Sequence, residues 1–490
     1  MAWVVLAGLA AARGGGEELP GGLAAIRSDL QERVETGELP SVAVGVLRDG
    51  RIVWREGFGW ADREAGTEAT PETVYGLASL GKSITASAVL ALVDRGELSL
   101  EAPIGPLLAP AHLRRGGGGA EPVVTLRQVL RMTAGVPHGN YTYDRAADAA
   151  AVTGERMVED RGVVIFAPGA RLEYSNFTFA LLERVLERTT GLTYPEALER
   201  EVFAPLGMRR AFVAETTAPE GTAARYAEDG ERLPDRFPRP RSSRAVNASV
   251  DDLLRYAAFH LGTALPGQRS IYSDALRESS HVDRTGGLGG RIAAGWGSFD
   301  LPDGELWLLS NGRDQGVQST LAMLPERDLA VVVLANVTGD ATDGLASSIL
   351  DALAPGFLAQ VDGVMAEYET WSAGDREPAA LDGTWRGFVE TPSGRVPIAL
   401  TLVAEGTSTV ALGEAPPVEL SGERIDEQLL VGSFEGLLVL EELPDGTHRI
   451  DLGLHPEGDR LEGTLTAVFD NDRGSFALPA YAELERAPDP

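Results

Sequence analysis

Lys82 is the only lysine among the 43 basic residues of this chain, and it lies three positions after Ser79. Arginine stays protonated at any working pH, whereas a buried lysine can lose its proton and act as a base. In a helix, residues i and i+3 share one face with about 5–6 Å between their Cβ atoms, so the Lys82 amine can reach the Ser79 hydroxyl. The pair therefore predicts a serine nucleophile activated by a lysine.

The same segment also fits a second motif. Residues 76–83 satisfy G-x-x-x-x-G-K-S, the phosphate-binding loop of NTPases. That loop follows an apolar strand of a parallel sheet, and a second apolar strand ends in a magnesium-binding aspartate. Here the most apolar strand-like run, 331–335, leads into Asn336 instead. The context argues against a P-loop NTPase, which stays as an alternative.

Tyr174 and Asn176 lie between a Pro168-Gly169 turn and the body of a predicted helix. A tyrosine beside an ammonium group can ionise below its usual pKa and act as a base. The amide of Asn176 offers one acceptor and two donors to a substrate amide. Taken alone, the two residues also fit an ordinary wall residue and a helix cap.

Composition excludes several classes of function. With 490 residues, 43% of them hydrophobic and 24% charged, the chain is long enough for two or three globular domains. A formal net charge of −30 repels phosphates, so we expect no nucleic-acid partner. The absence of cysteine excludes disulfides, thiolate metal sites and a cysteine nucleophile. The six histidines form no tight ligand spacing, so we expect no catalytic metal and no cofactor.

The first 20 residues form a possible signal-like segment. Residues 2–12 are apolar, end in three alanines and follow no basic leader. The run is too short to span a bilayer, so we expect no integral membrane span. A periplasmic or secreted location follows as an expectation, with a cytoplasmic location as the alternative.

Apolar periodicity predicts the elements that position Ser79. Residues 41–48 and 51–58, joined by Asp49-Gly50, predict a β-hairpin. Residues 79–95 have helical spacing, which places Ser79 at a helix N-terminus, where the dipole favours negative charge. Further helices are predicted at 174–190, 251–261 and 343–353, and strands at 306–309, 320–324 and 329–334, the last buried on both faces. The mixture predicts an α+β fold, with an antiparallel sheet flanked by helices.

These motifs follow one another in the order found in the superfamily of serine β-lactamases and penicillin-binding D-Ala-D-Ala peptidases. Leu77–Lys82 resembles the nucleophile motif, 129–137 the Leu-Leu-x-x-Thr-Ser-Gly-Leu-Pro stretch, and Tyr174–Asn176 the Tyr-x-Asn motif. Residues 96–100, 249–253, 295–297 and 329–336 complete the order. Over about residues 22–358, the chain resembles the class C, D-aminopeptidase and family VIII esterase side of this superfamily. The resemblance implies an acyl-enzyme at Ser79, with proton transfer shared by Lys82 and Tyr174.

The third motif departs from the family pattern. Relatives carry Lys or His, any residue, and then Gly, whereas the aligned triplet here is Ser310-Asn311-Gly312. An oxyanion hole needs only backbone amides, and those of Ser79 and Arg313 can serve. Without this cation, we expect weaker recognition of a substrate carboxylate, unless the Arg313 guanidinium supplies the positive charge. We assign to substrate binding Asn176, Ser310, Gly312 and Arg313.

Four segments are expected along the chain. They are the signal-like segment 1–20, a β-lactamase-like serine hydrolase domain 21–360, a linker 361–380 that includes Gly374–Pro378, and an all-β barrel 381–490. The barrel opens with Gly383-Thr384-Trp385, as lipocalin-like domains do. Residues 215–244 form a long polar loop, which makes them a candidate lid or rim of the site.

The sequence therefore predicts a serine hydrolase that forms an acyl-enzyme on a small ester, amide or peptide substrate. We expect esterase or peptidase activity in preference to hydrolysis of β-lactams. The alternatives are a catalytically silent penicillin-binding-like or ligand-binding protein, and the P-loop NTPase. A silent protein would not be modified by a serine-directed probe.

Overall fold

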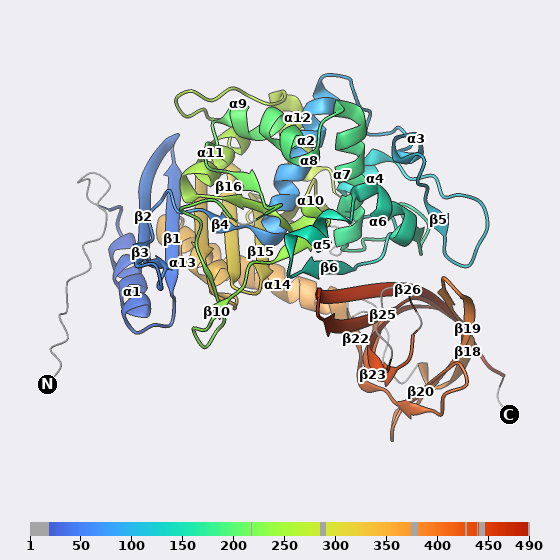
Figure 1. Cartoon of the computed structure of the whole chain (residues 1–490). Helices are drawn as coiled ribbons and strands as arrows, with labels where there is room; N and C mark the ends of the chain where they lie inside the picture. Colours follow the sequence, from blue (N-terminus) through green and yellow to red (C-terminus); the bar gives the residue numbers. More distant parts are fainter. Residues whose placement is uncertain are drawn as a thin grey trace, which may run out of the picture.

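The computed structural model describes residues 19–216, 218–284, 291–373, 381–426, 429–438, 440 and 446–488. The predicted signal-like residues 1–18 and the Gly374–Pro378 part of the predicted linker lie outside these ranges. Helices surround an antiparallel sheet in the first part of the chain, and a barrel-like sheet follows (Figure 1). This arrangement confirms the predicted α+β fold.

The central sheet has eight strands, and each neighbouring pair is antiparallel. In spatial order they are β13 (Ile292–Ala293), β14 (Trp296–Asp300), β15 (Leu306–Asp314), β16 (Val317–Leu324), β17 (Leu329–Ala335), β1 (Ser41–Arg48), β2 (Arg51–Asp62) and β3 (Thr67–Glu68). The predicted hairpin is confirmed as β1 and β2. A phosphate-binding loop needs a parallel sheet, so the NTPase alternative is wrong.

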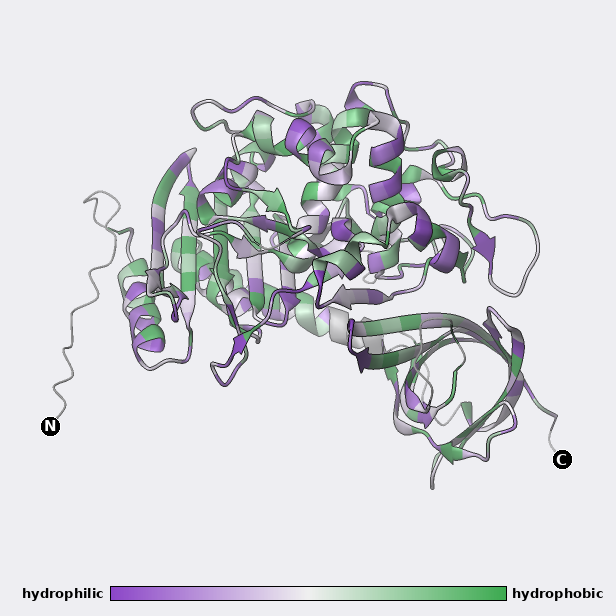
Figure 2. Cartoon of the chain, viewed as in Figure 1, coloured by the Kyte–Doolittle hydropathy of each residue, from purple (hydrophilic) through white to green (hydrophobic). Residues whose placement is uncertain are grey.

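Both faces of this sheet are covered by helices (Figure 1). On one face, α1 (Leu23–Glu35) contacts β2, and α13 (Ala341–Leu353) contacts β16 and β17. On the other face, α11 (Val250–His260) contacts β1 and β17. All seven residues of β17 are buried, as predicted for a strand covered on both sides. Figure 2 shows hydrophobic residues along these central strands.

Gly45 in β1 shows how closely the sheet and α11 pack. A Cβ atom at this position would lie 2.5 Å from Val250 Cγ1 of α11. On either side of Gly45, Val44 and Val46 point into the core around α13, while Ala43 and Leu47 join the core around α11. Because successive side chains of a strand point to opposite faces, β1 contributes residues to two separate hydrophobic cores.

Several predicted boundaries differ from the structure. The strand predicted at 306–309 continues to Asp314, because β15 stays paired with β16 up to the turn at Gly316. The predicted loop 215–244 contains four short elements, β9 (Arg225–Tyr226), β10 (Arg232–Leu233), β11 (Phe237–Arg239) and α10 (Arg241–Arg244). The first part of the predicted linker 361–380 is helical, since it belongs to α14 (Phe357–Ala373).

The C-terminal part forms a nearly closed barrel-like sheet, as predicted. Its strands are β18 (Gly383–Thr391), β19 (Gly394–Leu402), β20 (Thr409–Leu412), β21 (Val418–Glu419), β22 (Ser421–Asp426), β23 (Leu429–Gly436), β24 (His448–Glu457), β25 (Arg460–Asn471) and β26 (Gly474–Arg486). Trp385 is fully buried, and its Nε1 donates to the Leu381 carbonyl at 2.8 Å.

The barrel is joined to the first part of the chain by a backbone ladder. The start of β26 pairs with β6 (Asn140–Tyr143), and β6 pairs on its other edge with β11. The ring of Phe476 on β26 packs edge-on against the rings of Tyr141 and Tyr143. The barrel therefore contacts β6, and Asn140 of β6 binds Asn176. None of the described helices combines the length and apolarity needed to cross a bilayer.

Candidate active site

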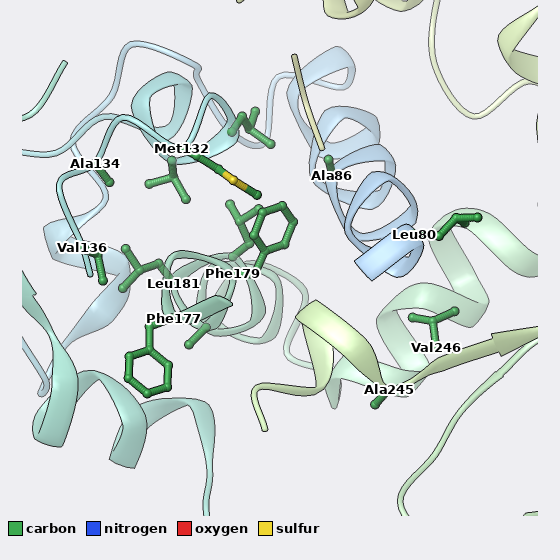
Figure 3. Packing of buried hydrophobic residues seen from close by; sticks show 14 of the residues in the cluster. Leu80, Ala86, Met132, Ala134, Val136, Phe177, Phe179, Leu181, Ala245 and Val246 are labelled. Atoms are coloured by element: carbon green, nitrogen blue, oxygen red, sulfur yellow. The ribbon is translucent and has the colours of Figure 1, made fainter. Parts of the chain in front are cut away.

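Ser79 lies in a 3₁₀ turn, Ala78–Leu80, that leads directly into α2 (Gly81–Asp94). The predicted position at a helix N-terminus is therefore confirmed. Ala78 has a φ of 44°, in the left-handed region that an L-residue adopts only at a cost in free energy. Strained backbone of this kind concentrates at functional sites. Figure 3 shows Leu80, which directly precedes α2, together with Phe177 and Phe179 on a neighbouring helix.

The Ser79 hydroxyl receives two hydrogen bonds from residues that sequence reasoning had assigned to it. Lys82 Nζ donates at 3.0 Å, and the Tyr174 hydroxyl donates at 2.9 Å. The structure thus brings the three predicted catalytic residues together around one oxygen atom. Such a cluster has the geometry of an activated nucleophile with its bases.

Lys82 is buried, with 2% of its surface exposed. Its Nζ also donates to the Ser243 carbonyl at 3.2 Å and lies 5.0 Å from the centre of the Tyr174 ring. Burial lowers the pKa of Lys82; the neighbouring Tyr174 opposes this effect, and the charge of Arg244 adds to it. A lowered pKa makes the unprotonated amine accessible, as a general base requires.

Tyr174 precedes α7 (Asn176–Thr190), and the residue as a whole is 40% exposed while its hydroxyl points at Ser79. Burial of the phenol favours the neutral form. The charge of Lys82, hydrogen bonds to Lys82 and Ser79, and the charge of Arg244 outweigh burial, so the pKa of Tyr174 is lowered. Lys82 and Tyr174 are therefore both competent proton acceptors, and the geometry leaves open which of them is the base.

Asn176 is the first residue of α7 and is buried. Its Nδ2 donates to Asn140 Oδ1 on β6, while its own Oδ1 is buried without a hydrogen-bond partner in the described part of the chain. The helix cap is Ser175, whose Oγ accepts from the Thr178 amide at 3.0 Å. The capping role considered for Asn176 is therefore filled by its neighbour, which leaves its amide oxygen for a ligand.

Ser310 and Gly312 face α2 from β15. Ser310 Oγ donates to Ser83 Oγ at 3.2 Å and lies 3.5 Å from the Leu80 carbonyl, so its hydroxyl is used in packing β15 against the helix. At Gly312, a Cβ atom would lie 2.1 Å from the Leu77 carbonyl and 2.6 Å from the Ser79 amide nitrogen. Only glycine allows β15 to approach the nucleophile this closely.

The guanidinium of Arg313 does not replace the missing cation. Alternation along β15 places Asn311 and Arg313 on the opposite face from Ser310, where both side chains bind Asp343 of α13. Only the backbone amide of Arg313 therefore remains as a candidate for oxyanion binding. Among the described residues, β14 pairs with β15 only as far as Leu309, so the edge of β15 beyond it has no strand neighbour on that side.

Sequence reasoning missed two residues beside this cluster. The His138 ring lies 5.8 Å from the Tyr174 ring, and burial, followed by the charges of Lys82 and Arg244, lowers the pKa of His138 to about 4. Arg244 donates to Asp314 Oδ2 at 3.0 Å and to Thr142 Oγ1 at 2.7 Å, so it connects β15 to β6. His138 directly follows the 129–137 motif, which was a usable signal. Nothing distinguished Arg244 from the other arginines.

This arrangement can perform acyl transfer. A hydroxyl with two adjacent proton acceptors can attack a carbonyl carbon, and the backbone around Gly312 borders the position where the oxyanion would form. The buried His138, with its lowered pKa, is neutral at working pH and contributes no charge.

Comparisons with known proteins agree with this geometry. Esterase EstB of Burkholderia gladioli is 31% identical over 307 residues, which cover 55% of this chain and 75% of that protein. Protein flp of Staphylococcus aureus (strain MW2) is 23% identical over 338 residues, and 65% of its length is spanned. The fold resembles a penicillin-binding protein homologue of Pyrococcus abyssi, an octamer, with a TM-score of 0.57 and 20% identity over 94% of this chain and 100% of that one.

A class C β-lactamase from Rhodobacter sphaeroides has a similar fold, with a TM-score of 0.53 and 21% identity over 68% of this chain and 98% of that one. The model of one family, Beta-lactamase, matches residues 26–355. That range contains Ser79, Lys82, Tyr174 and the whole central sheet. The chain therefore belongs to the Beta-lactamase family.

Proposed function

We propose that this protein is a serine hydrolase that acts through an acyl-enzyme on a small ester or amide, including peptide amides. The observation that carries the proposal is the Ser79 hydroxyl, which receives hydrogen bonds from both Lys82 and Tyr174. The relationship to an esterase at 31% identity supports ester hydrolysis as the first reaction to test.

The first half of the reaction acylates Ser79. Lys82 or Tyr174 accepts the hydroxyl proton as Ser79 Oγ attacks the substrate carbonyl carbon, and negative charge develops on the carbonyl oxygen. The backbone amides of Ser79 and Arg313 are the proposed donors to that oxygen. The base then gives its proton to the leaving alcohol or amine, and the carbonyl re-forms as an ester of Ser79.

The second half releases the product. Water attacks the Ser79 ester while the same base accepts a proton from it, and that proton returns to Ser79 Oγ as the acyl group leaves as a carboxylic acid. The Oδ1 of Asn176 has no hydrogen-bond partner among the described residues, and this supports a role in accepting a hydrogen bond from a substrate N–H. We therefore assign Asn176 to substrate binding.

Ester and amide hydrolysis are proposed ahead of β-lactam hydrolysis. Ser310 stands where relatives carry a cation, its hydroxyl is used in packing, and the Arg313 guanidinium is bound to Asp343. Neither residue brings a positive charge to a substrate carboxylate at this position. Rapid acylation by penicillins would contradict this part of the proposal.

The direct test is hydrolysis of short-chain p-nitrophenyl esters by the full chain, with Ser79→Ala as the control. The proposal expects turnover with release of one carboxylic acid per ester, and background rates for the variant. Equal rates for both proteins, or none for either across esters and peptide amides, would favour the silent ligand-binding alternative.

A further inference from the structure

A small cavity lies under the segment that follows Val213, apart from the catalytic cluster. Its volume is about 30 Å³. It is bordered among others by Gly76, Thr222, Arg225, Asp235, Arg236 and Gly316. Because one water needs about 10–15 Å³, the cavity holds about two oxygen-sized atoms.

Three of the bordering residues contain a buried polar atom without a hydrogen-bond partner in the described part of the chain. These atoms are Thr222 Oγ1, Arg225 Nη1 and Arg236 Nε. All three belong to side chains that can donate, and guanidinium groups donate only. A cavity bordered by donors that lack acceptors has the chemistry of an anion site.

Arg225 is the central group, because its guanidinium forms no hydrogen bond or ion pair with any described residue. Arg236, by contrast, donates to Ser475 Oγ at 2.6 Å and lies 3.4 Å from Asp144, and Arg244 binds Asp314 at 3.0 Å. An arginine remains charged in proteins. Arg225 is half-buried and its Nη1 atom is buried, so the missing counter-charge carries a cost in free energy. A counter-ion in the cavity would remove that cost.

Two carboxylates face Arg225, and neither neutralises it at close range. Asp314 is shared with Arg244, and Asp235 is an exposed residue at the cavity that has no nitrogen of Arg225 within 4 Å. Among the described residues that border the cavity, Asp235 is the carboxylate that could compete for the site, since a change of its rotamer could bring it toward Arg225. The experiment below therefore includes this residue.

Two glycines lie against Arg225, and one of them, Gly316, leaves room for its side chain. A Cβ atom at Gly76 would lie 3.5 Å from Arg225 Nη2, and one at Gly316 would lie 2.5 Å from Arg225 Cβ. Gly76 is three residues before Ser79, so their Cα atoms are separated by at most about 11 Å. This bound allows one extended substrate to be attached to Ser79 and to place a carboxylate at Arg225.

We propose that Arg225, together with Thr222 and Arg236, binds a small anion, either a halide or a carboxylate group. The carboxylate can come from solution or from one end of a substrate whose carbonyl is attacked by Ser79. The second source rests on the proposed function, whereas binding of a free anion does not.

The first arm of the test measures binding without catalysis. The thermal midpoint Tm of the full chain is followed while sodium chloride or sodium acetate is increased, with ionic strength held constant by a bulky sulfonate salt. A saturable rise in Tm is expected for the wild type and for Arg386→Gln, an exposed barrel arginine, and it is expected to be absent for Arg225→Gln. If Arg225→Gln fails to fold, Thr222→Val is the variant to use. It removes a single donor and should weaken the response at least several-fold.

The same titration on Asp235→Asn separates an external anion from an internal counter-ion. An anion site predicts that this variant keeps or strengthens the response, because a competing carboxylate is lost. If Asp235 is the partner of Arg225, Asp235→Asn lowers Tm in the absence of salt and the wild type shows no saturable response. That result, or identical responses from the wild type and Arg225→Gln, overturns the proposal and leaves only water in the cavity.

The second arm identifies the source of the anion. It compares kcat/KM for p-nitrophenyl pentanoate and for the p-nitrophenyl monoester of glutaric acid, which ends in a carboxylate. If the substrate supplies the anion, Arg225→Gln reduces kcat/KM at least about ten-fold for the acidic ester and leaves the neutral ester unchanged. If a free anion binds, chloride and acetate change the hydrolysis rates of both esters equally in the wild type. In Arg225→Gln they change the rate of neither ester. A protein that hydrolyses no ester still gives a result in the first arm.

Discussion

Lys82 Nζ lies 3.0 Å from Ser79 Oγ, one helical turn away, and no carboxylate neutralises this amine among the described residues. Its remaining close contacts are the Ser243 carbonyl and the rings of Tyr174 and Phe179. A lysine in such a setting holds its proton less tightly than one in water. The account of catalysis depends on this relationship.

Lys82→Arg should abolish most ester hydrolysis while the fold remains. Arginine keeps the positive charge but cannot give up a proton at working pH, and general-base catalysis contributes about 10²–10⁴-fold. The loss is measured as kcat/KM, with circular dichroism and Tm as controls of folding. A variant with near-normal turnover would show that Lys82 is not needed as a proton acceptor.

Tyr174→Phe removes one of the two hydrogen bonds to Ser79 Oγ and keeps the ring in place. We expect kcat to fall by about 10²-fold or more, since the phenol is a proton-transfer group and not a packing residue. The residue is 40% exposed, so Tm should change little. A large drop in Tm without loss of kcat would assign Tyr174 a structural role instead.

Arg244→Gln should shift the acid limb of the pH profile of kcat/KM to higher pH. The charge of Arg244 lowers the pKa of both Lys82 and Tyr174, so its removal raises both values, and the active base form then appears only at higher pH. A shift of roughly half a pH unit or more is expected for the loss of a nearby charge. Arg244→Lys, which keeps the charge, should restore the profile. Unchanged limbs in Arg244→Gln would contradict the electrostatic role.

Gly312→Ala should damage both stability and activity. The added Cβ overlaps the Leu77 carbonyl and the Ser79 amide, so β15 must move away from the nucleophile turn at a cost of about 1–3 kcal/mol. Gly344→Ala is the matched control, because Gly344 is exposed on α13 with no atom within 4 Å of the added Cβ. The control should be neutral or stabilising by up to about 1 kcal/mol. Similar unfolding curves for the two variants would refute the packing argument.

Gly474→Ala tests whether the barrel supports the active site. A Cβ atom at Gly474 would lie 1.9 Å from the Thr142 carbonyl, so it would push β26 away from β6, the strand whose Asn140 binds Asn176. Gly394 has a similar positive φ, 122° against 148°, but no atom within 4 Å, so Gly394→Ala has the same backbone strain without the overlap. We expect lower kcat/KM for Gly474→Ala than for Gly394→Ala. Equal activity would show that the barrel and the site are independent.

Contacts that depend on local helix geometry could be predicted from the sequence. Side-chain orientations that depend on how distant segments pack could not. Ser79 and Lys82 are one helical turn apart, so their contact followed from spacing alone. Tyr174 is 95 residues from Ser79, and only the order of motifs placed it there. The orientation of Arg313 depends on strand parity in β15, whose predicted end at 309 was five residues short of Asp314.

Arg244 escaped prediction because it acts through contacts with distant segments. Arg244 binds Asp314 and Thr142, residues about 70 and 102 positions away, from a stretch that looked like a polar loop. Arg225 is distinguished only by the partners it lacks, which no sequence pattern reveals. The barrel was recognisable from its short alternating strands, but its ladder to β6 required the folded chain.

Covalent labelling of Ser79 tests the central claim most directly. Intact-mass spectrometry after treatment with a fluorophosphonate should show a single adduct on the wild type, mapped by peptide digestion to Ser79, and no adduct on Ser79→Ala. An unlabelled wild type, or an adduct that persists in Ser79→Ala, would contradict the assignment of Ser79 as an activated nucleophile.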